Sequence, residues 1–438
     1  MSWATEAFET VRGKMKKTIT TTLCLTALLA LAPTAFMTPV RAADGLSLRM
    51  AVWTGNAKHL ALLNGIADAY KAKHPEIGTI TFDTIPYDNY TTTLTTQIAG
   101  GNAPDLAWIL ESAAPDFVGS GALLALDETL SSTAGYDFAD LSPSATALWR
   151  QDGKLFAYPF STSPYAIFAN LDVLAAAGQK TPADLIAAGS WNWQTVAAEA
   201  AAVHAKSGKN GVEIRDFDYK DWTLLTTIWD GWAARPWSAD GKTCTLDSPD
   251  MAEAMAFLHK AIFKDGAIPG PGTSGDFFAG DTAFSITQIS RASLLKDGAF
   301  KWDLVPLPAG PKGDYSVIGQ AGIGVFKNGQ HPQDAAAFLA FLSSPENSLN
   351  LAQFFPPPRL SQLNAETLGK TNPLLSKGQL EEVVVKGITT GKVSPSHTNN
   401  AQIAQQIRAS LDAAWTPDAD LTTVLSGACA KIGPLLAH

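Results

Sequence analysis

Residues 46–110 read LSLRMAVWTGNAKHLALLNGIADAYKAKHPEIGTITFDTIPYDNYTTTLTTQIAGGNAPDLAWIL, and two apolar patterns alternate along this stretch. Three short segments are β-rich, which is typical of strands: residues 46–55, 79–87 and 104–110. Between them, two segments carry apolar side chains at helical spacing: residues 59–76 and 89–101. This order of elements predicts a parallel sheet with right-handed crossovers, that is, an α/β domain.

The same alternation resumes after residue 160. Residues 163–178 look like a strand followed by a short helix, and strands are expected at residues 280–288 and 301–308. Helical spacing recurs in five later segments: residues 191–208, 248–266, 334–353, 399–415 and 420–436. No long linker separates the two halves of this 438-residue sequence. We therefore expect two lobes joined by short crossings.

The first 42 residues are predicted to be a secretory signal peptide. Met15, Lys16 and Lys17 form a basic start, a short apolar run follows, and small residues lead to a cleavage site near Ala42 and Ala43. Prolines interrupt the apolar run, so it is too short to span a bilayer, and Met15 is the expected natural start. Cys24 lies inside this run rather than at the cleavage point, which argues against a lipid anchor. We expect a free protein of the periplasm with no membrane insertion of the mature chain.

The composition excludes some classes of partner. A formal net charge of −9 argues against nucleic acids and anionic membrane surfaces. After removal of the signal peptide only Cys244 and Cys429 remain. They could pair in an oxidising compartment, but the sequence does not place them in contact. A chain of this length can build its core without a disulfide.

Polar and aromatic residues gather where the predicted strands end. Ligands of parallel sheets bind beyond the carboxyl ends of the strands. Trp53 to His59, Tyr87, and Glu111 with Ser112 fall at such ends. From its position alone, Glu111 could be half of an acid/base pair, a metal ligand, an acceptor for a polar ligand or a surface acid.

Two motifs that could suggest other chemistry are better explained as loops. GPGTSG (residues 270–275) matches a dinucleotide fingerprint but follows a helix instead of a strand. DFDYKD (residues 216–221) lacks the glycine and glutamate of a calcium loop and is expected to be an acidic surface loop. The histidines are scattered, so no metal site and no cofactor are expected. Glu111 and Asp230 could be nominated as a glycosidase pair, but the sequence gives no reason to prefer them.

Five motifs occur in an order that resembles a known family. They are GGNAPDLAW (100–108), DGKLFAYPFSTSPYAIFANLDVLAAAG (152–178), SWNWQTVAAEA (190–200), FFAGDTAFSIT (277–287) and WDLVPLPAGPKGDYSVIGQAGIGVFKNGQHPQDAAAFLAFLSSPE (302–346). From about residue 46 to the C-terminus, the chain resembles the extracellular solute-binding proteins of sugar-type ABC importers, the maltose-binding-protein superfamily. The resemblance implies the class II type of periplasmic-binding-protein fold, in which two α/β lobes close on a ligand.

The resemblance also implies lobe boundaries. The three crossings would lie near residues 159–163, 305–308 and 356–361. Lobe one would then comprise residues 44–160 and 306–356, and lobe two residues 161–305 and 357–438.

By the same resemblance, ligand contacts are expected from several loops. Lobe one and its crossing would offer Trp53, Asn56, Lys58, His59, Glu111, Ser112, Ser161, Thr162, Gly319 and Gln320. Lobe two would offer Gln288, Ser290 and Arg291, with Trp222 and Trp232 in place of an aromatic platform that related sugar binders carry and this sequence lacks. For Lys58 and His59 the alternative is a solvated helix start, and for Trp222 and Trp232 the alternative is packing in the core.

The expected function is capture of a carbohydrate by a monomer that delivers it to ABC permease subunits, with no catalytic residues. The helix at residues 399–415 lacks the aromatic that some maltodextrin binders carry, so a monosaccharide, disaccharide or polyol is favoured. Arg359 and Arg291 keep open an anionic sugar derivative, glycerol phosphate or sulfonate, because arginine binds such groups bidentately. Bracing of a crossing is the alternative role for Arg359. A secreted glycoside hydrolase is the second alternative.

Overall fold

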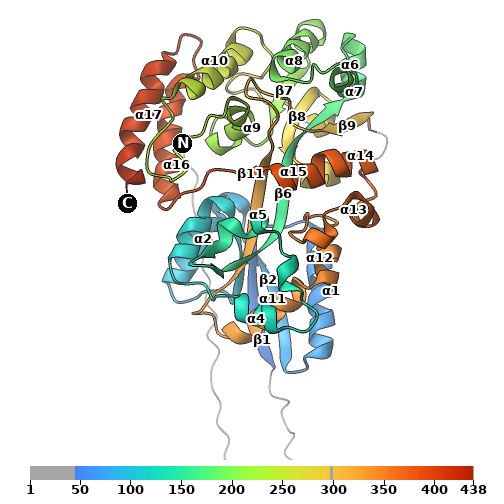
Figure 1. Cartoon of the computed structure of the whole chain (residues 1–438), viewed down its shortest axis with the longest axis vertical. Coiled ribbons are helices and arrows are strands. Elements are labelled where there is room, and N and C mark those ends of the chain that lie inside the picture. The colour runs from blue at the N-terminus through green and yellow to red at the C-terminus, as the bar shows by residue number, and fades with distance from the viewer. Residues whose placement is uncertain (1–44, 296–298, 438) are drawn as a thin grey trace, which may run out of the picture. The chain divides into compact units, whose positions relative to one another are not determined.

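The computed structural model describes residues 45–295 and 299–437 (Figure 1). The predicted signal peptide, its cleavage site and Cys24 lie outside the described residues. From Gly45 onward the described chain is a mixed α/β structure built on one large sheet.

The opening stretch folds as its pattern predicts. Its strands and helices are β1 (Leu46–Val52), α1 (Ala57–Lys73), β2 (Ile77–Thr84), α2 (Tyr90–Ala99) and β3 (Leu106–Leu110). β1 pairs in parallel with both β2 and β3, and Met50 lies opposite Phe82 on one side and Leu106 on the other. The prediction of a parallel α/β arrangement for this segment is confirmed.

The complete sheet is mixed, which the parallel pattern of the first strands does not indicate. Its later strands are β6 (Ala157–Asn170), β7 (Asn210–Ile214), β8 (Thr282–Gln288), β9 (Trp302–Val305), β10 (Val317–Val325) and β11 (Lys392–Val393). The order is β2-β1-β3-β10-β6-β8-β7, with β11 beside β10 and β9 beside β6. β10 is antiparallel to both β3 and β6. The two long strands β6 and β10 thereby connect two sets of shorter strands (Figure 1).

Helices and short 3-10 turns fill the connections. The remaining α-helices are α3 (Ala114–Gly119), α4 (Asp127–Ser132), α5 (Pro143–Thr146), α6 (Leu171–Ala177), α7 (Pro182–Ala187), α8 (Trp193–Ser207), α9 (Thr226–Trp229), α10 (Pro249–Phe263), α11 (Pro332–Leu342), α12 (Pro345–Leu351), α13 (Ala365–Thr371), α14 (Lys377–Gln379), α15 (Lys386–Thr390), α16 (Asn400–Leu411) and α17 (Leu421–Leu436). Two 3-10 turns matter for the site: η2 (Glu111–Ala113) and η5 (Trp222–Leu225). A separate small hairpin pairs β4 (Arg150–Gln151) with β5 (Lys154–Leu155).

The described residues bury two large apolar cores and a smaller third one. One large core packs β1, β2 and β3 against α1 and α11, and the other packs β7 and β8 against α8, α10, α16 and α17. The third lies between β6 and the segment from α13 to α15. β6 contributes Tyr158 to the first core and Ile167 to the second, while β10 contributes Ile323 and Val317 in the same way. The same two strands therefore belong to both large cores.

Two segments pack against a different core from the one that the expected lobe boundaries imply. They are residues 306–316, before β10, and the residues that follow the proline run up to Ser361. Tyr315, before β10, donates its hydroxyl to the Thr227 carbonyl at 2.6 Å, in the second core. Ser361, after the proline run, hydrogen-bonds Asp140 at 2.7 Å, beside the first core. Residues 306–316 thus lie with the second core, and residues up to Ser361 keep contact with elements of the first.

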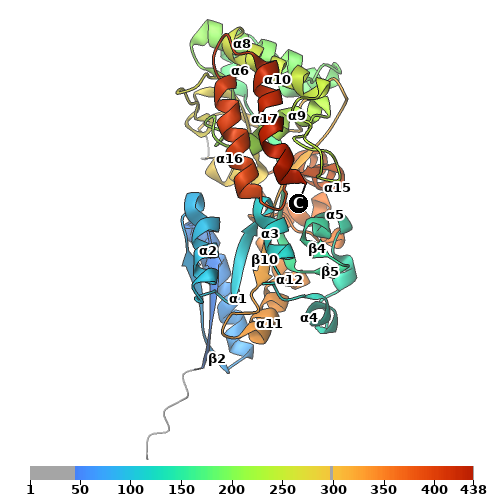
Figure 2. The same cartoon turned by 90° about the vertical axis from the view of Figure 1, so that its left-hand side faces the viewer.

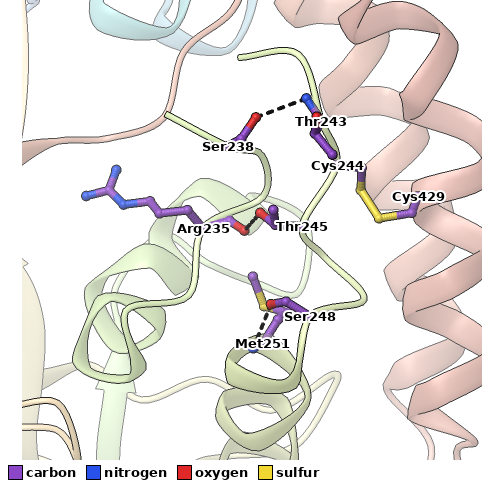
Figure 3. The surroundings of a disulfide bond; sticks show 8 residues. All are labelled: Arg235, Ser238, Thr243, Cys244, Thr245, Ser248, Met251 and Cys429. Carbon is purple, nitrogen blue, oxygen red and sulfur yellow. Dashed lines mark hydrogen bonds between the residues drawn. A yellow bond between two sulfur atoms is a disulfide. The ribbon is translucent and has the colours of Figure 1, made fainter. Parts of the chain in front are cut away.

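A disulfide between Cys244 and Cys429 ties the loop before α10 to α17 (Figure 3). The two residues are 185 positions apart in the sequence and their Cα atoms are 5.4 Å apart. Ser238 and Thr245 hold the loop through hydrogen bonds to the Thr243 amide at 3.0 Å and the Arg235 carbonyl at 2.5 Å. α17 packs side by side with α16 (Figure 2), so the disulfide anchors both helices. The pairing that the sequence left open is present.

Replacing both Cys244 and Cys429 with alanine should lower the free energy of unfolding by about 2–4 kcal/mol, because the crosslink restricts the unfolded chain. Urea unfolding of oxidised wild type against the double variant measures the difference. Added reductant should destabilise the wild type equally and leave the variant unchanged. Equal unfolding midpoints of wild type with and without reductant would show that the bond contributes nothing.

Candidate ligand-binding cleft

An aromatic cluster covers the carboxyl ends of the first three strands. Trp53, just after β1, makes edge-to-face contacts with Tyr87 at 6.2 Å, Tyr90 at 5.1 Å and Trp108 at 4.8 Å between ring centroids. Tyr90 and Trp108 are buried, whereas Tyr87 is 57% exposed. Tyr87 therefore presents its ring at the edge of the cluster, where an aromatic side chain can contact a ligand.

Glu111 opens the turn η2 directly after β3. Burial raises the pKa of Glu111 to about 7, with the charge of Asp221 acting in the same direction and the backbone N–H groups of Glu111 and Gln320 opposing it. Among the described residues no basic side chain forms an ion pair with it. The site therefore holds a carboxyl group whose pKa is raised and whose charge no basic side chain of the described residues compensates.

Acidic side chains that follow strands of both large cores act on Tyr87 and Tyr165. Loss of hydration from the protein packed around them raises the pKa of both phenols well above the usual range, although part of the Tyr87 side chain stays in contact with solvent. Glu111 is the first charge that adds to this in each case. Asp221 and Asp216, from the segment after β7, also act on both rings. Acidic groups that follow β3 and β7 therefore lie near Tyr87, which follows β2, and near Tyr165 of β6, and these residues define the candidate cleft.

The register of β6 and β10 decides which of their side chains face this cleft. Ser163 lies opposite Gly319, and Tyr165 lies two residues further along β6, on the same face. Thr162 and Gln320 are opposite each other on the other face. There both side chains are buried, and Gln320 donates to the Ala145 carbonyl at 3.3 Å.

Of the two crossing residues expected to touch ligand, Ser161 shares the face of Tyr165, whereas Thr162 does not. The buried side chain of Gln320 lies on the same face as Thr162, which does not favour its predicted contact with ligand, although its backbone N–H acts on Glu111. Sequence reasoning missed Tyr165. The period of two in Ser161, Ser163 and Tyr165 is the signal that could have found it.

Gly319 leaves room for the amide of Gln288, which ends β8. A Cβ placed on Gly319 would lie 1.8 Å from Gln288 Nε2 and 3.4 Å from the Tyr165 ring. Gln288 is partly exposed and pairs with Tyr165 across the strands. The predicted residues Gly319 and Gln288 are thus brought together, and the glycine acts by leaving space.

Gly319→Ala should displace the Gln288 amide and weaken solute binding at least tenfold, a cost of about 1.4 kcal/mol. The free energy of unfolding should change little, because the displaced atom ends a flexible side chain. Calorimetric titration measures the affinity. Gly65→Ala, in α1 with open space around the new methyl, is the matched control. Unchanged affinity of the Gly319 variant would remove Gln288 from the site.

The loop after β1 has mainly structural contacts. Asn56 accepts a hydrogen bond from the Lys58 amide at 2.9 Å and so caps α1. His59 lies 3.0 Å from the Thr54 hydroxyl and packs against Phe354 at 4.6 Å between ring centroids. Burial lowers the pKa of His59, which favours the neutral ring. Lys58 is exposed, as expected for a solvated helix start.

Arg359 and the two tryptophans expected in lobe two do not reach the cleft. Arg359 is fully buried, donates to the Asp137 and Ser343 carbonyls at 3.0 Å each, and lies 3.6 Å from the Asp140 carboxylate. Trp222 and Trp232 are each 3% exposed and belong to the second large core. The polar or aromatic surfaces of these three side chains are used in packing, which does not favour the predicted contacts with ligand.

Arg291 lies beside the cleft but is already paired. Its guanidinium is 2.8 Å from the Asp216 carboxylate, and both side chains are partly exposed. Ser290, next to it, accepts a hydrogen bond from Ser293 through its carbonyl at 3.1 Å. Ser112 is partly exposed beside Glu111 in η2. Arg291 therefore offers no uncompensated positive charge.

The two motifs interpreted as loops lie together. DFDYKD and GPGTSG both contribute to the wall of a hollow of about 530 Å³. Asp216 lines this hollow, and its charge also acts on Tyr87. Asp216, Asp218 and Tyr219 adopt left-handed backbone conformations there. The acidic loop was expected at the surface, and its contribution to the cleft through Asp216 and Asp221 was missed.

The proposed catalytic pair is not assembled. Asp230 is ion-paired with Arg235, and its charge acts on Tyr315 rather than on Glu111. Within residues 45–295 and 299–437, no group of three or more potential metal ligands gathers. The helices of the same residues include none with the length and apolar character needed to span a bilayer.

Comparisons with known proteins agree on one family. A family model described as bacterial extracellular solute-binding protein matches residues 65–375. A binding protein of Brucella abortus is 29% identical over 322 residues, covering 68% of this chain and 72% of the relative.

Solved structures show the same two-lobed fold. The Listeria monocytogenes substrate-binding protein Lmo0181, in complex with cycloalternan, matches with a TM-score of 0.76 and 21% identity, over 90% of this chain and 98% of that one. UgpB of Mycobacterium tuberculosis, in complex with glycerophosphocholine, matches with a TM-score of 0.74 and 18% identity, over 90% and 98%.

Proposed function

The chain belongs to the bacterial extracellular solute-binding proteins, and from this premise we propose that it captures a small carbohydrate, a mono- or disaccharide or a polyol, and delivers it to the permease of an ABC importer. The observation that carries the proposal is the convergence of Tyr87, Glu111, Tyr165 and Asp221 from segments of both large cores. The mature protein would be an exported monomer of the periplasm.

The chemistry of these groups suits a sugar. The C–H face of a sugar ring packs on aromatic rings such as Tyr87, and carboxylates such as Glu111 accept from neighbouring hydroxyls. Ring contacts contribute about 1 kcal/mol each, and charge-assisted hydrogen bonds about 1.5–3 kcal/mol each. Two rings and three such bonds reach the roughly 8 kcal/mol that micromolar affinity requires only if ordering costs stay small. Both sides of the cleft must therefore contribute.

We propose lobe boundaries that follow the packing of the cores. The first crossing stays near residues 159–163, inside β6, as the sequence suggested. The contacts of residues 306–316 favour a second crossing within β10, and those of Ser361 favour a third crossing after the proline run. Solute that contacts both lobes would then favour the closed form, since a ligand shifts an equilibrium only by its differential affinity for the two states.

The alternatives are less well supported by the site. An anionic solute would need free arginine, but Arg359 is buried in its own contacts and Arg291 pairs with Asp216. The glycoside hydrolase pair that the sequence allows would need Asp230 beside Glu111, and Asp230 is ion-paired with Arg235. UgpB, which binds glycerophosphocholine, shows that a neighbour of the same fold takes a ligand other than a plain sugar.

A thermal-shift screen tests the proposed function. Sugars, polyols, glycerol phosphate and sugar phosphates would be compared, because a ligand that binds only the folded state raises the melting temperature. At least one neutral or amino sugar or polyol should stabilise the protein, and its concentration should stay constant on long incubation. Stabilisation by phosphates alone, or consumption of the solute, would contradict carbohydrate capture.

A further inference from the structure

Negative charge in the cleft is not balanced by the basic side chains around it. The charges that act on Tyr87 are Glu111, Asp221, Arg291 and Asp216. Arg291 is already paired with Asp216 at 2.8 Å. This leaves Glu111 and Asp221, neither of which forms an ion pair within the described residues.

Neither of these two carboxylates is neutralised by its local hydrogen bonds. Asp221 accepts from the Thr223 amide at 3.1 Å and from the Thr223 hydroxyl, both through Oδ1, as the cap of η5. Glu111 faces two backbone N–H groups and repels Asp221. Acceptor capacity remains on both, and neither partner supplies a positive charge.

A buried acceptor without a partner lies on α16, a helix that contacts the turn beginning with Glu111 and the turn that follows Asp221. Asn400, the first residue of α16, is 9% exposed, and its Oδ1 has no hydrogen-bond partner in the described structure. α16 contacts both η2, which begins with Glu111, and η5, which follows Asp221. A buried polar atom without a partner costs free energy unless something donates to it. Asn400 therefore adds an unsatisfied oxygen at the start of a helix that contacts the turns next to both carboxylates.

Solute capture would remove water from these groups. A buried carboxylate is costly unless it is both hydrogen-bonded and paired with positive charge. Neutral hydroxyl groups can donate hydrogen bonds but leave the charge uncancelled. A protonated amine carries a positive charge, and its N–H groups are all hydrogen-bond donors. It therefore matches the acceptor oxygens of Glu111, Asp221 and Asn400.

We infer that the solute carries a protonated amine, as on an amino sugar or amino polyol, which donates to Glu111, Asp221 and Asn400. This inference rests on the proposed function and specifies the chemical class of its solute. Tyr87, exposed beside these acids, adds the attraction of a ring face for a cation. A metal ion is a poorer occupant, because the described residues gather no group of three or more ligating side chains.

Matched solutes separate charge from shape. Glucose, glucosamine and N-acetylglucosamine, the corresponding galactose set, and sorbitol with N-methylglucamine would be titrated near neutral pH by calorimetry and thermal shift. In at least one set the amine should bind at least tenfold more tightly than its neutral and acetylated partners. Glu111→Gln should reduce the amine to the level of the neutral partner. Glu253→Gln, which removes the same charge from an exposed position on α10, should leave the preference unchanged.

The other outcomes distinguish this inference from the proposed function. Equal or tighter binding of a neutral or acetylated partner would overturn the amine inference and leave carbohydrate capture standing. Binding of sugar phosphates alone would overturn both, as would no binding of any member. Choline is a cation without N–H donors. A rise in the melting temperature of the protein with choline but with no amine would overturn the inference that the solute donates hydrogen bonds from an amine. Asn400→Leu should weaken the amine more than the neutral partner, which a merely structural role would not produce.

Discussion

Replacing Glu111 with glutamine is expected to stabilise the empty protein at pH 8 by up to about 3 kcal/mol while weakening solute binding at least tenfold. Burial raises the pKa of this carboxyl from 4.5 to about 7. The unfolded chain therefore releases the proton first as the pH rises. The contribution of Glu111 to the free energy of unfolding therefore falls between about pH 4.5 and pH 7 and is constant above that range. Glutamine carries no charge, so it avoids the loss.

Urea unfolding at pH 5 and pH 8 measures this effect. The variant should gain stability relative to wild type at pH 8 and lose the gain at pH 5. Burial also raises the pKa of Glu213 to about 7, so part of the pH dependence should remain in the variant. Glu253→Gln should match wild type at both pH values. A Glu111 variant that is no more stable than wild type at pH 8 would show that this carboxyl is not buried as described.

Replacing Arg359 with leucine is expected to destabilise the protein by about 3–5 kcal/mol, as when one partner of a buried ion pair is removed. Its guanidinium is fully buried, donates to two carbonyls, lies near Asp140 and stacks over Tyr136 at 4.7 Å. Leucine would leave those two carbonyls without their donor and would remove the positive charge next to the Asp140 carboxylate. The choice between neutral, cationic and anionic solutes should stay as in wild type.

Chemical denaturation of the Arg359 variant gives the stability loss, and titration at a temperature where it remains folded gives its solute preference. Arg291→Leu is the matched control, since Arg291 is 44% exposed and should cost no more than about 1 kcal/mol. A stable Arg359 variant with altered charge preference would return this arginine to the ligand site.

Much of the fold follows from the sequence because its elements have clear periods. The first strands and helices carry patterns that local sequence determines, and they lie within a few residues of their predicted bounds. The antiparallel insertion of β10 between β3 and β6 depends on contacts between distant segments, which the pattern of a single strand does not encode. The pairing of Cys244 with Cys429 is non-local for the same reason.

The site was predictable only where a residue follows a strand end. Tyr87 and Glu111 were selected in this way, and in the structure the charge of Glu111 acts on Tyr87. Thr162 and Gln320 were misplaced because the face of a strand depends on register. Arg359 was expected to contact ligand because its partners lie far away in the sequence and were not visible there. In the structure it donates to the Asp137 carbonyl. Asp216 and Asp221 were missed because an acidic loop has the same composition whether it faces solvent or a cleft.

Calorimetric titration of wild type, Tyr87→Ala and Asp221→Asn with the solute found by the screen tests the central claim most directly. Capture in the described cleft predicts one site per chain and at least tenfold weaker binding in each variant, because Tyr87 and Asp221 come from segments on opposite sides of that cleft. Wild-type affinity in either variant would contradict the claim that solute is held between the two.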